Sequence, residues 1–433
     1  MSMSRQTGTR PLPGTSGRLA MVLGILIALC AGSSCDLQAQ TYTVIHNFSN
    51  QGDGRWPGTG LTIDPAGNLY GTSTNGGAGG YGTVFKLTHR GSGWILTTLY
   101  SFTETEDGGL PSGKVIFGPE GLLYGATEFG GITGCGLGNG CGVVFSLTPN
   151  PTVCKTTSCP WHETVLHRFS GAPDGDEPGQ VVFDGAGNMY FETAEGGAFS
   201  EGSVVELSPT GGGWAEQVVH SFGPAPDGAF PADSPLIFDT TGKLYGTTAY
   251  GGAYAWGAIF RLTPSRGGWS EETLWSFQPG GPGQYVPTAG LIFDSSGNLY
   301  GATKGKGSDA ENGAAFELPS SGGGLTQLYA FLGNSNQQGF GPLGSLVMDA
   351  AGNLYGTTFS DGPYNAGTVF ELAHSGDTWT YISLHDFTGG SDGGYPDSDL
   401  VFDAEGNMYG TAFGGGSPTC ESGCGVVFEI SLQ

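Results

Sequence analysis

The chain has 433 residues, of which 83 are glycine and 25 are proline, and its formal net charge is −25. Nucleic-acid binding needs basic patches that neutralise phosphates, so this balance excludes a nucleic-acid partner and disfavours an anionic membrane surface. So much glycine and proline would indicate disorder in a chain without a period, whereas with a period it is typical of short strands joined by turns. The charge itself indicates either a solvated acidic surface or an attraction for divalent cations.

Residues 1–39 have the pattern of a secretory signal peptide. Three arginines precede the apolar run 19–31, which is too short to span a membrane, and no later stretch is apolar enough to do so. We therefore predict cleavage after Ala39 and an exported protein, placed outside the cell, on its surface or in the periplasm. The alternative is a lipoprotein anchored through Cys35, although the usual leucine three residues earlier is missing. Cleavage would leave 11 basic and 38 acidic residues, a balance of −27.

A pattern of eleven residues recurs seven times along the rest of the chain. It consists of an apolar run, a turn and a second apolar run, as in Leu-Ile-Phe-Asp-Ser-Ser-Gly-Asn-Leu-Tyr-Gly at 291–301. Its copies begin near residues 61, 115, 181, 236, 291, 346 and 400, a period of about 55 with one insertion. Self-similarity at a fixed period predicts a repeat architecture, in which every copy supplies the same supersecondary unit.

Each copy is predicted to supply four strands, which we name A to D. Strand A is a short apolar run, and a tight Asp-x-x-Gly-Asn turn leads to strand B with its Leu-Tyr-Gly-Thr motif. A glycine-rich loop leads to strand C, for example Gly-Thr-Val-Phe-Glu-Leu at 367–372. Strand D usually opens with tryptophan, closes with phenylalanine eight residues later, and is followed by Asp-Gly-x-x-Pro.

The last copy stops after strand C at residues 425–430, while residues 41–48 match strand D and precede the first copy. An open array would leave two unpaired strand edges, which promote aggregation. We therefore predict that residues 41–48 form the outer strand of the last blade and close the ring. The predicted fold is all-β: residues 40–433 form a seven-bladed β-propeller with four antiparallel strands per blade, and we expect a monomer.

Three segments recur in most copies: the core Leu-Ile-Phe-Asp-x-x-Gly-Asn-Leu-Tyr-Gly-Thr-Thr, the following Gly-Gly, and Gly-Thr-Val-Phe-Glu-Leu. Over residues 41–433 they resemble the GloVer-type tandem repeats of bacterial exported proteins described as "choice-of-anchor" proteins. Strands A and B are also similar to NHL repeats and to the sensor propellers of two-component regulators. The resemblance implies a propeller and export, and it implies no particular activity. The family label also implies an anchor after the repeats; we expect none here, because the last repeat ends at Gln433.

Six cysteines would remain after cleavage, in three close pairs: Cys135 with Cys141, Cys154 with Cys159, and Cys420 with Cys424. An exported chain permits disulfides. In the first and last pairs the second cysteine stands at the same place before strand C, so its partner lies across the B–C loop. We therefore predict three local disulfides, although six cysteines allow 15 connectivities. Zinc binding is the alternative, but these spacings, without a histidine pair, are not typical of zinc knuckles.

Neither the histidines nor the turn aspartates form a pattern typical of catalysis. Four histidines lie two residues before the strand-D phenylalanine, a place that other copies fill with tyrosine or tryptophan, so we interpret them as packing residues: His46, His167, His220 and His385. The A–B turns each supply one carboxylate where calcium needs several ligands, so we interpret these aspartates as turn residues: Asp64, Asp184, Asp239, Asp294, Asp349 and Asp403.

The D–A and B–C loops are expected to share the rim around the central channel, where propellers commonly bind ligands. The Asp-Gly-x-x-Pro motifs would place an incomplete ring of carboxylates there: Asp53, Asp107, Asp174, Asp227 and Asp392. Copy five adds Lys304 and Lys306 in its B–C loop. We predict that a polar ligand binds at this rim, with ordinary turn chemistry as the alternative. Weak calcium binding at Asp107 and Asp227 is a further hypothesis, and we expect no other cofactor.

Copy three departs from the repeat with Glu192 and Glu195, and paired carboxylates can act as general acid and base. Sequence drift in one copy explains the same departure. We predict a binding or interaction module for an unidentified extracellular glycan or envelope protein. Two alternatives stay open: a polysaccharide-processing enzyme that uses Glu192 and Glu195, and a structural surface protein without a small ligand.

Overall fold

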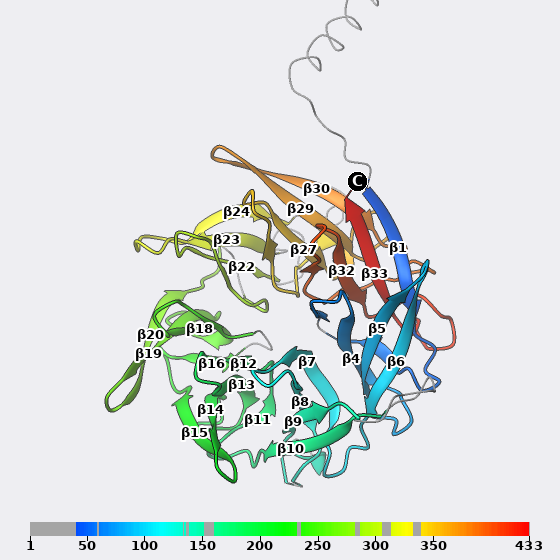
Figure 1. Cartoon of the computed structure of the whole chain (residues 1–433). Helices are drawn as coiled ribbons and strands as arrows, with labels where there is room; N and C mark the ends of the chain where they lie inside the picture. The colour runs from blue at the N-terminus through cyan, green and yellow to red at the C-terminus, as the bar shows by residue number, and fades with distance from the viewer. Residues whose placement is uncertain are drawn as a thin grey trace, which may run out of the picture. The chain divides into compact units, whose positions relative to one another are not determined.

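A computed structural model describes residues 40–432 apart from 59, 133, 136–137, 151–159, 232–234, 282–285, 305–312 and 332–338. Residues 41–431 form one compact unit, in which seven antiparallel sheets surround a common axis (Figure 1). The prediction of a seven-bladed β-propeller is therefore confirmed. The predicted signal peptide with Cys35, the pair Cys154 and Cys159, and Lys306 lie outside the described residues. In the described part of the chain, no helix has the length and apolar character that a membrane crossing demands.

In blades 1 to 6 the strands pair in chain order, and a short additional strand from the Asp-Gly-x-x-Pro segment pairs with the end of strand B in blades 1, 3 and 4. Blades 1 to 3 consist of β2 (Arg55–Pro57), β3 (Thr62–Ile63), β4 (Leu69–Asn75), β5 (Thr83–Arg90) and β6 (Gly93–Ser101); β7 (Gly109–Phe117), β8 (Leu123–Phe129), β9 (Val143–Thr148) and β10 (His162–Arg168); and β11 (Asp176–Pro178), β12 (Val182–Phe183), β13 (Met189–Glu195), β14 (Ser203–Thr210) and β15 (Gly213–Ser221).

Blades 4 to 7 repeat this arrangement, and the last of them takes its outer strand from the beginning of the chain. They consist of β16 (Gly228–Pro231), β17 (Ile237–Phe238), β18 (Leu244–Gly251), β19 (Ala258–Ser265) and β20 (Gly268–Ser276); β21 (Ile292–Phe293), β22 (Leu299–Thr303), β23 (Ala314–Leu318) and β24 (Thr326–Ala330); β25 (Gly339–Phe340), β26 (Val347–Met348), β27 (Leu354–Thr358), β28 (Ser360–Asp361), β29 (Thr368–Ser375) and β30 (Thr378–Asp386); and β31 (Val401–Phe402), β32 (Met408–Ala412), β33 (Val426–Leu432) and β1 (Gln40–Asn47).

The A–B turns are held by the aspartates that the sequence places there. In blade 1, Asp64 accepts hydrogen bonds from the backbone and side-chain amides of Asn68 (2.9 and 2.7 Å) and from the Tyr70 hydroxyl (3.1 Å). Burial alone would raise the pKa of Asp64, but these hydrogen bonds lower it below its ordinary value. Blade 2 uses Glu120 instead, which accepts a hydrogen bond from the Tyr124 hydroxyl at 3.0 Å. The interpretation of these carboxylates as turn residues is confirmed.

Buried phenylalanines join neighbouring blades all the way round the ring. The phenylalanine that closes strand D lies 5.0–5.5 Å, between ring centroids, from a phenylalanine of the next blade. The pairs are Phe48–Phe85, Phe102–Phe145, Phe169–Phe191, Phe222–Phe260, Phe277–Phe316, Phe331–Phe370 and Phe387–Phe428. Such edge-on and tilted pairs contribute about 0.5–1.5 kcal/mol beyond the burial of their area. The same contact therefore stabilises all seven blade interfaces.

Blade 3 keeps this contact although its sequence departs from the repeat. Elsewhere, a glycine after the strand-B tyrosine leaves room for the strand-C phenylalanine; a Cβ on Gly71 would lie 2.7 Å from the Phe85 ring. In blade 3 the two sizes are exchanged, because Phe191 pairs with Val205 in the register that joins Gly71 to Phe85. Phe169 of blade 2 then packs on Phe191. The departure at position 191 is thus a packing exchange that conserves the blade interface.

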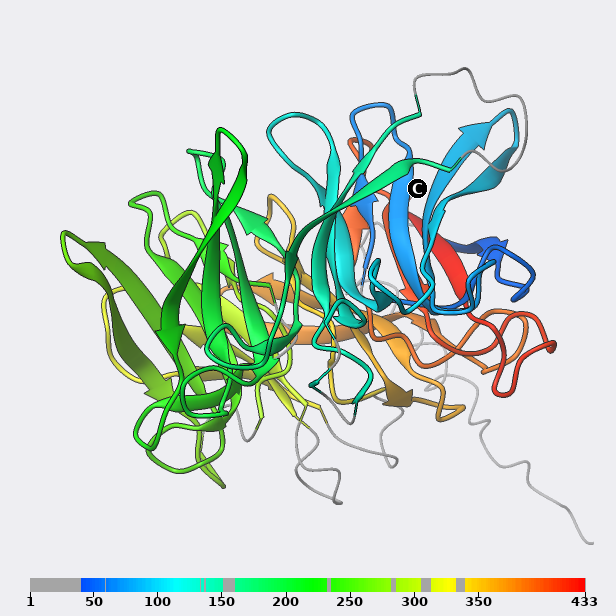
Figure 2. The same ribbon diagram turned by 90° about the horizontal axis from the view of Figure 1, so that it is seen from below.

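The N-terminal strand completes the last blade, as predicted. The strand order of this sheet is β1-β33-β32-β31, and β1 lies beside β33 (Figure 1, Figure 2). After β1, the Phe48 N–H donates to the Gly425 carbonyl at 3.1 Å. The Tyr42 hydroxyl donates to the Asp392 carbonyl of blade 6, and its ring stacks on His385 with centroids 3.6 Å apart. Strand β1 therefore contacts both neighbours of its own blade.

Candidate functional site

One residue of every blade, directly before the apolar run of strand A, lies near its counterpart in another blade or lines a cavity that several blades share. In chain order these residues, which we call the channel ring, are Gly60, Lys114, Gln180, Pro235, Gly290, Ser345 and Asp399. They approach one another between neighbouring blades: a Cβ on Gly290 would lie 2.7 Å from both Pro235 and Ser345. The channel ring carries six residue types in seven copies, so it is the place where otherwise similar blades differ in chemistry.

Five members of the channel ring line a cavity of about 370 Å³; they are Gln180, Pro235, Gly290, Ser345 and Asp399. Phe230 and Leu343 add apolar surface to its wall, and Thr288 and Asp397 add polar groups. This volume falls in the range of about 300–1,000 Å³ that is typical of small-ligand pockets. A mostly apolar wall with a few converging polar groups is the usual composition of such a site.

An ion pair crosses part of the channel ring. Lys114 of blade 2 reaches Asp399 of blade 7, with Nζ and Oδ2 3.1 Å apart, and both side chains are largely buried. The intervening blade 1 contributes Gly60, whose φ is +148° and whose Cβ would lie 3.3 Å from Asp399 and 3.5 Å from Lys114. The second oxygen of Asp399 accepts a hydrogen bond from the Ser345 N–H at 2.6 Å. Glycine at position 60 therefore gives this ion pair the space it needs.

Two polar atoms of the cavity wall are buried without a hydrogen-bond partner among the described residues. They are Oδ1 of Asp397 and Oγ1 of Thr288. Burial, with a smaller contribution from the neighbouring carboxylate of Asp399, raises the pKa of Asp397 to about 7. An unpaired buried polar group costs about 1–3 kcal/mol. A ligand that hydrogen-bonds to these atoms would recover that free energy.

The backbone is strained where the D–A loops approach the channel. The residue before the proline has φ between 51° and 57° in six blades: Trp56, Leu110, Glu177, Phe230, Gly341 and Tyr395. The five that are not glycine donate their N–H to a B–C loop carbonyl of the preceding blade, at 2.7–3.2 Å. A bulky residue in this conformation costs about 1–3 kcal/mol and persists only where its surroundings hold it. The hydrogen bonds between blades supply that restraint.

Three of the strained residues are aromatic and pair with aromatic residues at the ends of B strands. Trp56 stacks on Phe413 with centroids 5.2 Å apart, and Tyr395 lies 5.5 Å from Phe359. Phe230, which lines the cavity, lies 5.9 Å from Tyr250, whose exposed fraction is 53%. The D–A loops therefore hold aromatic rings in fixed positions, and Tyr250, which lies beside the cavity residue Phe230, is the most open to solvent among them.

The five aspartates predicted to form a ring at this rim point elsewhere. Each accepts a hydrogen bond from the backbone N–H four residues earlier (2.9–3.3 Å) and contacts a histidine or tyrosine seven residues earlier on the outer strand (2.9–3.3 Å): Asp53, Asp107, Asp174, Asp227 and Asp392. Their carboxylates therefore face the outer strands of their own blades rather than a shared site at the channel mouth. Asp107 and Asp227, the predicted calcium ligands, belong to different blade interfaces.

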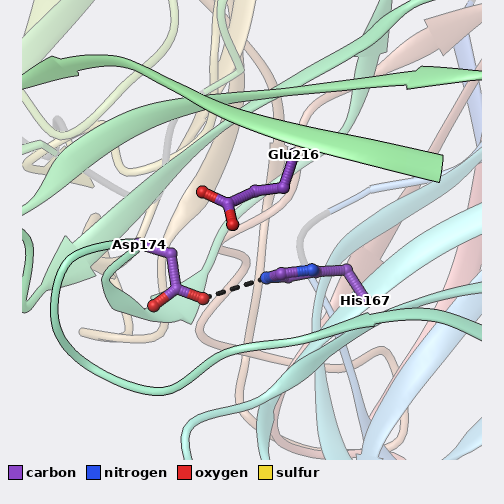
Figure 3. A group of neighbouring side chains, drawn as sticks. All are labelled: His167, Asp174 and Glu216. Carbon is purple, nitrogen blue, oxygen red and sulfur yellow. Dashed lines mark hydrogen bonds and ion pairs between the residues drawn. The ribbon is translucent and has the colours of Figure 1, made fainter.

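At one blade interface a third side chain joins such a pair. His167 Nε2 lies 2.9 Å from Asp174 Oδ2, and Glu216 of β15 points toward them (Figure 3). One nitrogen and two carboxylate oxygens of these residues lie within 4.8 Å of one another. Burial alone would raise the pKa of Asp174, but hydrogen bonds from His167 and Ser170 lower it below its ordinary value.

The remaining predicted residues do not converge. Glu192 is buried against blade 4, where a Cβ on Gly246 would lie 2.5 Å from its Oε1, whereas Glu195 is exposed at the end of β13. Residues three apart on a strand point to opposite faces. The structure therefore does not bring the two carboxylates together as an acid–base pair. Lys304 is exposed at the start of the B–C loop of blade 5.

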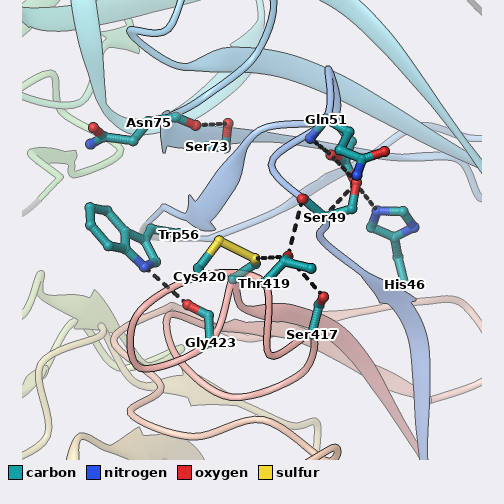
Figure 4. Close-up of a disulfide and its surroundings, with 12 residues drawn as sticks. His46, Ser49, Gln51, Trp56, Ser73, Asn75, Ser417, Thr419, Cys420 and Gly423 are labelled. Carbon is teal, nitrogen blue, oxygen red and sulfur yellow. Dashed lines mark hydrogen bonds and ion pairs between the residues drawn. A yellow bond between two sulfur atoms is a disulfide. The ribbon is translucent and has the colours of Figure 1, made fainter.

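Two of the three predicted disulfides are present among the described residues. Cys135–Cys141 and Cys420–Cys424 close the B–C loops of blades 2 and 7, with Cα atoms 5.0 and 5.1 Å apart. The second one anchors the start of the ring (Figure 4), because Thr419 beside it donates a hydrogen bond to the Ser49 carbonyl at 3.2 Å.

Replacing Cys420 and Cys424 together by serine should lower the free energy of unfolding by roughly 2 kcal/mol, because a short closed loop restricts the unfolded chain only modestly. Thermal and denaturant unfolding measure this loss, and wild-type protein under reducing conditions is the comparison. Peptide mapping without reduction should recover Cys420 joined to Cys424. A peptide that joins Cys135 to Cys420 would contradict the local pairing.

Comparison with known proteins agrees with this architecture. A family model described as the Gloeobacter/Verrucomicrobia repeat matches residues 33–158, 132–336 and 236–433. No curated protein matches the chain. A similar solved structure is the extracellular domain described as part of a hybrid two-component system from B. thetaiotaomicron, with 12% identity and a TM-score of 0.53 over 90% of this chain and 40% of that one. Another, described as a 6-phosphogluconolactonase from Bacteroides uniformis, has 14% identity and a TM-score of 0.48 over 80% and 88%.

This chain thus spans about 40% of the length of the B. thetaiotaomicron domain, and at 12% identity the likeness shows the propeller fold alone. The resemblance to GloVer-type repeats is confirmed, because the three matches of the family model together cover residues 33–433. The chain belongs to the Gloeobacter/Verrucomicrobia repeat family.

Proposed function

We propose that the protein is an exported binding module that holds a sugar residue of an extracellular glycan in the central cavity. The observation that carries this proposal is the pair of buried, unpaired acceptors, Asp397 Oδ1 and Thr288 Oγ1, in a cavity of about 370 Å³. Sugar hydroxyls donate hydrogen bonds to such oxygens, while the C–H face of the ring packs on apolar and aromatic groups such as Phe230 and Leu343.

Export is supported by the sequence of residues 1–39 and by two disulfides, which persist in oxidising compartments. An envelope protein is the second candidate partner. Three exposed aromatic residues occupy corresponding places in the B–C loops of blades 3, 4 and 6: Phe199, Tyr254 and Tyr364, with exposed fractions of 57%, 54% and 59%. Exposed aromatic residues are enriched where proteins bind one another.

Binding to a glycan array, with a parallel hydrolysis screen, tests the proposal. A glycan that binds wild-type protein should bind Thr288→Val and Asp397→Asn at least about tenfold more weakly, because valine has no hydroxyl and asparagine replaces one carboxylate oxygen by an NH2 donor. Glu195→Gln, which changes an exposed residue outside the cavity, should bind normally. Binding that survives both cavity variants but is lost on replacing Phe199, Tyr254 and Tyr364 would move the site to the loop tips. Glycan hydrolysis that depends on Glu192 or Glu195 would instead favour the alternative of a polysaccharide-processing enzyme.

A further inference from the structure

Five of the blade interfaces share a three-residue arrangement near the outer edge of the ring. It consists of the histidine or tyrosine two residues before the end of strand D, the aspartate of the following loop, and the residue two places after the start of strand D in the next blade. The histidine–aspartate pair recurs at four interfaces, with nitrogen and oxygen 2.9–3.3 Å apart. The pair is therefore part of the repeat, and the third residue distinguishes one interface from another.

Only one interface among the described residues brings three metal-ligating side chains together. Between blades 2 and 3, the third residue is Glu216, and its carboxylate joins His167 and Asp174 (Figure 3). From this geometry we infer a binding site for a divalent transition-metal ion, with zinc as the representative ion, held by His167, Asp174 and Glu216.

Other interfaces either lack one of these three ligands or hold it in a different hydrogen bond. Between blades 1 and 2 the nitrogen is missing, because Tyr100 binds Asp107 in the place that four interfaces fill with histidine. Between blades 6 and 7 the third place is filled by Tyr42, which stacks on His385. Between blades 3 and 4, Glu271 occupies the third place but accepts a hydrogen bond from the Thr273 hydroxyl at 3.1 Å. These interfaces are natural controls within the same chain.

The spacing of the donor atoms suits a metal ion. Zinc bonds of about 2.0–2.2 Å place neighbouring ligand atoms about 3–3.5 Å apart. The 2.9 Å between His167 Nε2 and Asp174 Oδ2 is close to that value, and exposed Glu216 has the freedom to approach from within 4.8 Å. The Ser170 hydroxyl holds the other oxygen of Asp174 at 2.7 Å, which leaves Oδ2 directed at the histidine. To bind the metal, Nε2 has to be the unprotonated nitrogen of the imidazole, with the ring proton on Nδ1.

The donor set also selects among ions. Imidazole nitrogen suits zinc, copper, iron and nickel, whereas calcium and magnesium prefer sites made only of oxygen. Two carboxylates beside one imidazole repel each other when no cation is present, and the chain's net charge of −25 raises the local concentration of cations. This site is therefore expected to take zinc and to discriminate against calcium.

Titration calorimetry of the untagged full chain, with its disulfides intact, tests the inference. Zinc should bind with one ion at the site, and cobalt should give visible absorption bands from the same site. Glu216→Gln and His167→Gln should each weaken zinc binding by about 10- to 100-fold. The matched variants Glu271→Gln and His220→Gln, at the next interface, should bind zinc as the wild type does.

Circular dichroism of Glu216→Gln should remain unchanged, because the side chain is exposed, so its loss of binding cannot be attributed to unfolding. The inference fails if zinc does not bind up to millimolar concentration, or if calcium binds as tightly as zinc. It also fails if Glu271→Gln weakens binding as much as Glu216→Gln does.

Discussion

Deleting residues 41–48 should leave a protein that is largely unfolded or aggregated. The deletion removes Ile45 and Phe48, which pack into the interface between the last blade and the first, and it exposes the edge of β33. Burial of two such side chains contributes roughly 3–6 kcal/mol, against a typical total stability of about 5–15 kcal/mol. An exposed strand edge also offers unpaired N–H and C=O groups to other chains.

The comparison needs two truncations, measured by thermal unfolding and by size-exclusion chromatography with light scattering. Removal of residues 1–39, which precede β1, should leave the melting temperature unchanged. A 49–433 protein that stays monomeric and melts like the wild type would show that β1 does not hold the ring closed.

Replacing Asp397 by asparagine should stabilise the protein at about pH 8 and weaken ligand binding in the cavity by at least about tenfold. The pKa of Asp397 is raised to about 7, so the folded state holds a proton that the unfolded state releases near pH 4. Wild-type stability should therefore fall as the pH rises from about 4 to about 7 and then stay constant. Asparagine needs no proton, so the variant's advantage should grow over the same interval, to at most roughly 4 kcal/mol.

Asp239 provides the control, because its contribution to stability changes with pH in the opposite direction to that of Asp397. Burial alone would raise the pKa of Asp239, but hydrogen bonds from Thr241, Lys243 and Tyr245 lower it below its ordinary value. Ionised Asp239 therefore stabilises the fold above about pH 4, and that contribution is lost as the pH falls below it. Asp239→Asn should be destabilised at neutral pH and equal to the wild type in acid. Denaturant unfolding at several pH values measures both variants, and an Asp397→Asn protein less stable than the wild type at pH 8 contradicts the buried-carboxylate account.

The architecture was predictable because it depends on what the seven copies share. The period of about 55, the turn aspartates and the strand-D match at residues 41–48 determined the blades, their number and the closing strand. The packing exchange in blade 3 was also visible in the sequence, but it was not recognised there as an exchange of side-chain size between two paired strands. Phe191 replaces the usual glycine in strand B, and Val205 replaces the usual phenylalanine in strand C. Because these two residues are paired, the large side chain has changed strands while the total side-chain volume is nearly kept.

The site was not predictable in the same way, because it depends on where side chains point. The aspartates of the D–A loops were predicted to face the channel, yet they turn toward histidines or a tyrosine of the outer strands, while Asp397 and Asp399 a few residues later line the cavity. A usable signal did exist in the alignment of the copies. The residue before strand A is lysine in one copy, glutamine, serine or aspartate in three others, and glycine or proline in the rest. A position that varies between otherwise constant segments is not required by the fold.

Completion of the last blade by β1 also governs when the chain can finish folding. Strand β1 is synthesised first and β33 last, and the contact between Thr419 and Ser49 joins residues 370 positions apart. Blades 1 to 6 can each form from a continuous stretch of chain as it is made, but the seventh needs both ends of the domain. Pairing across so long a separation is slow. The ring can therefore close only after β33 has been synthesised, and before that β1 has no neighbouring strand to pair with.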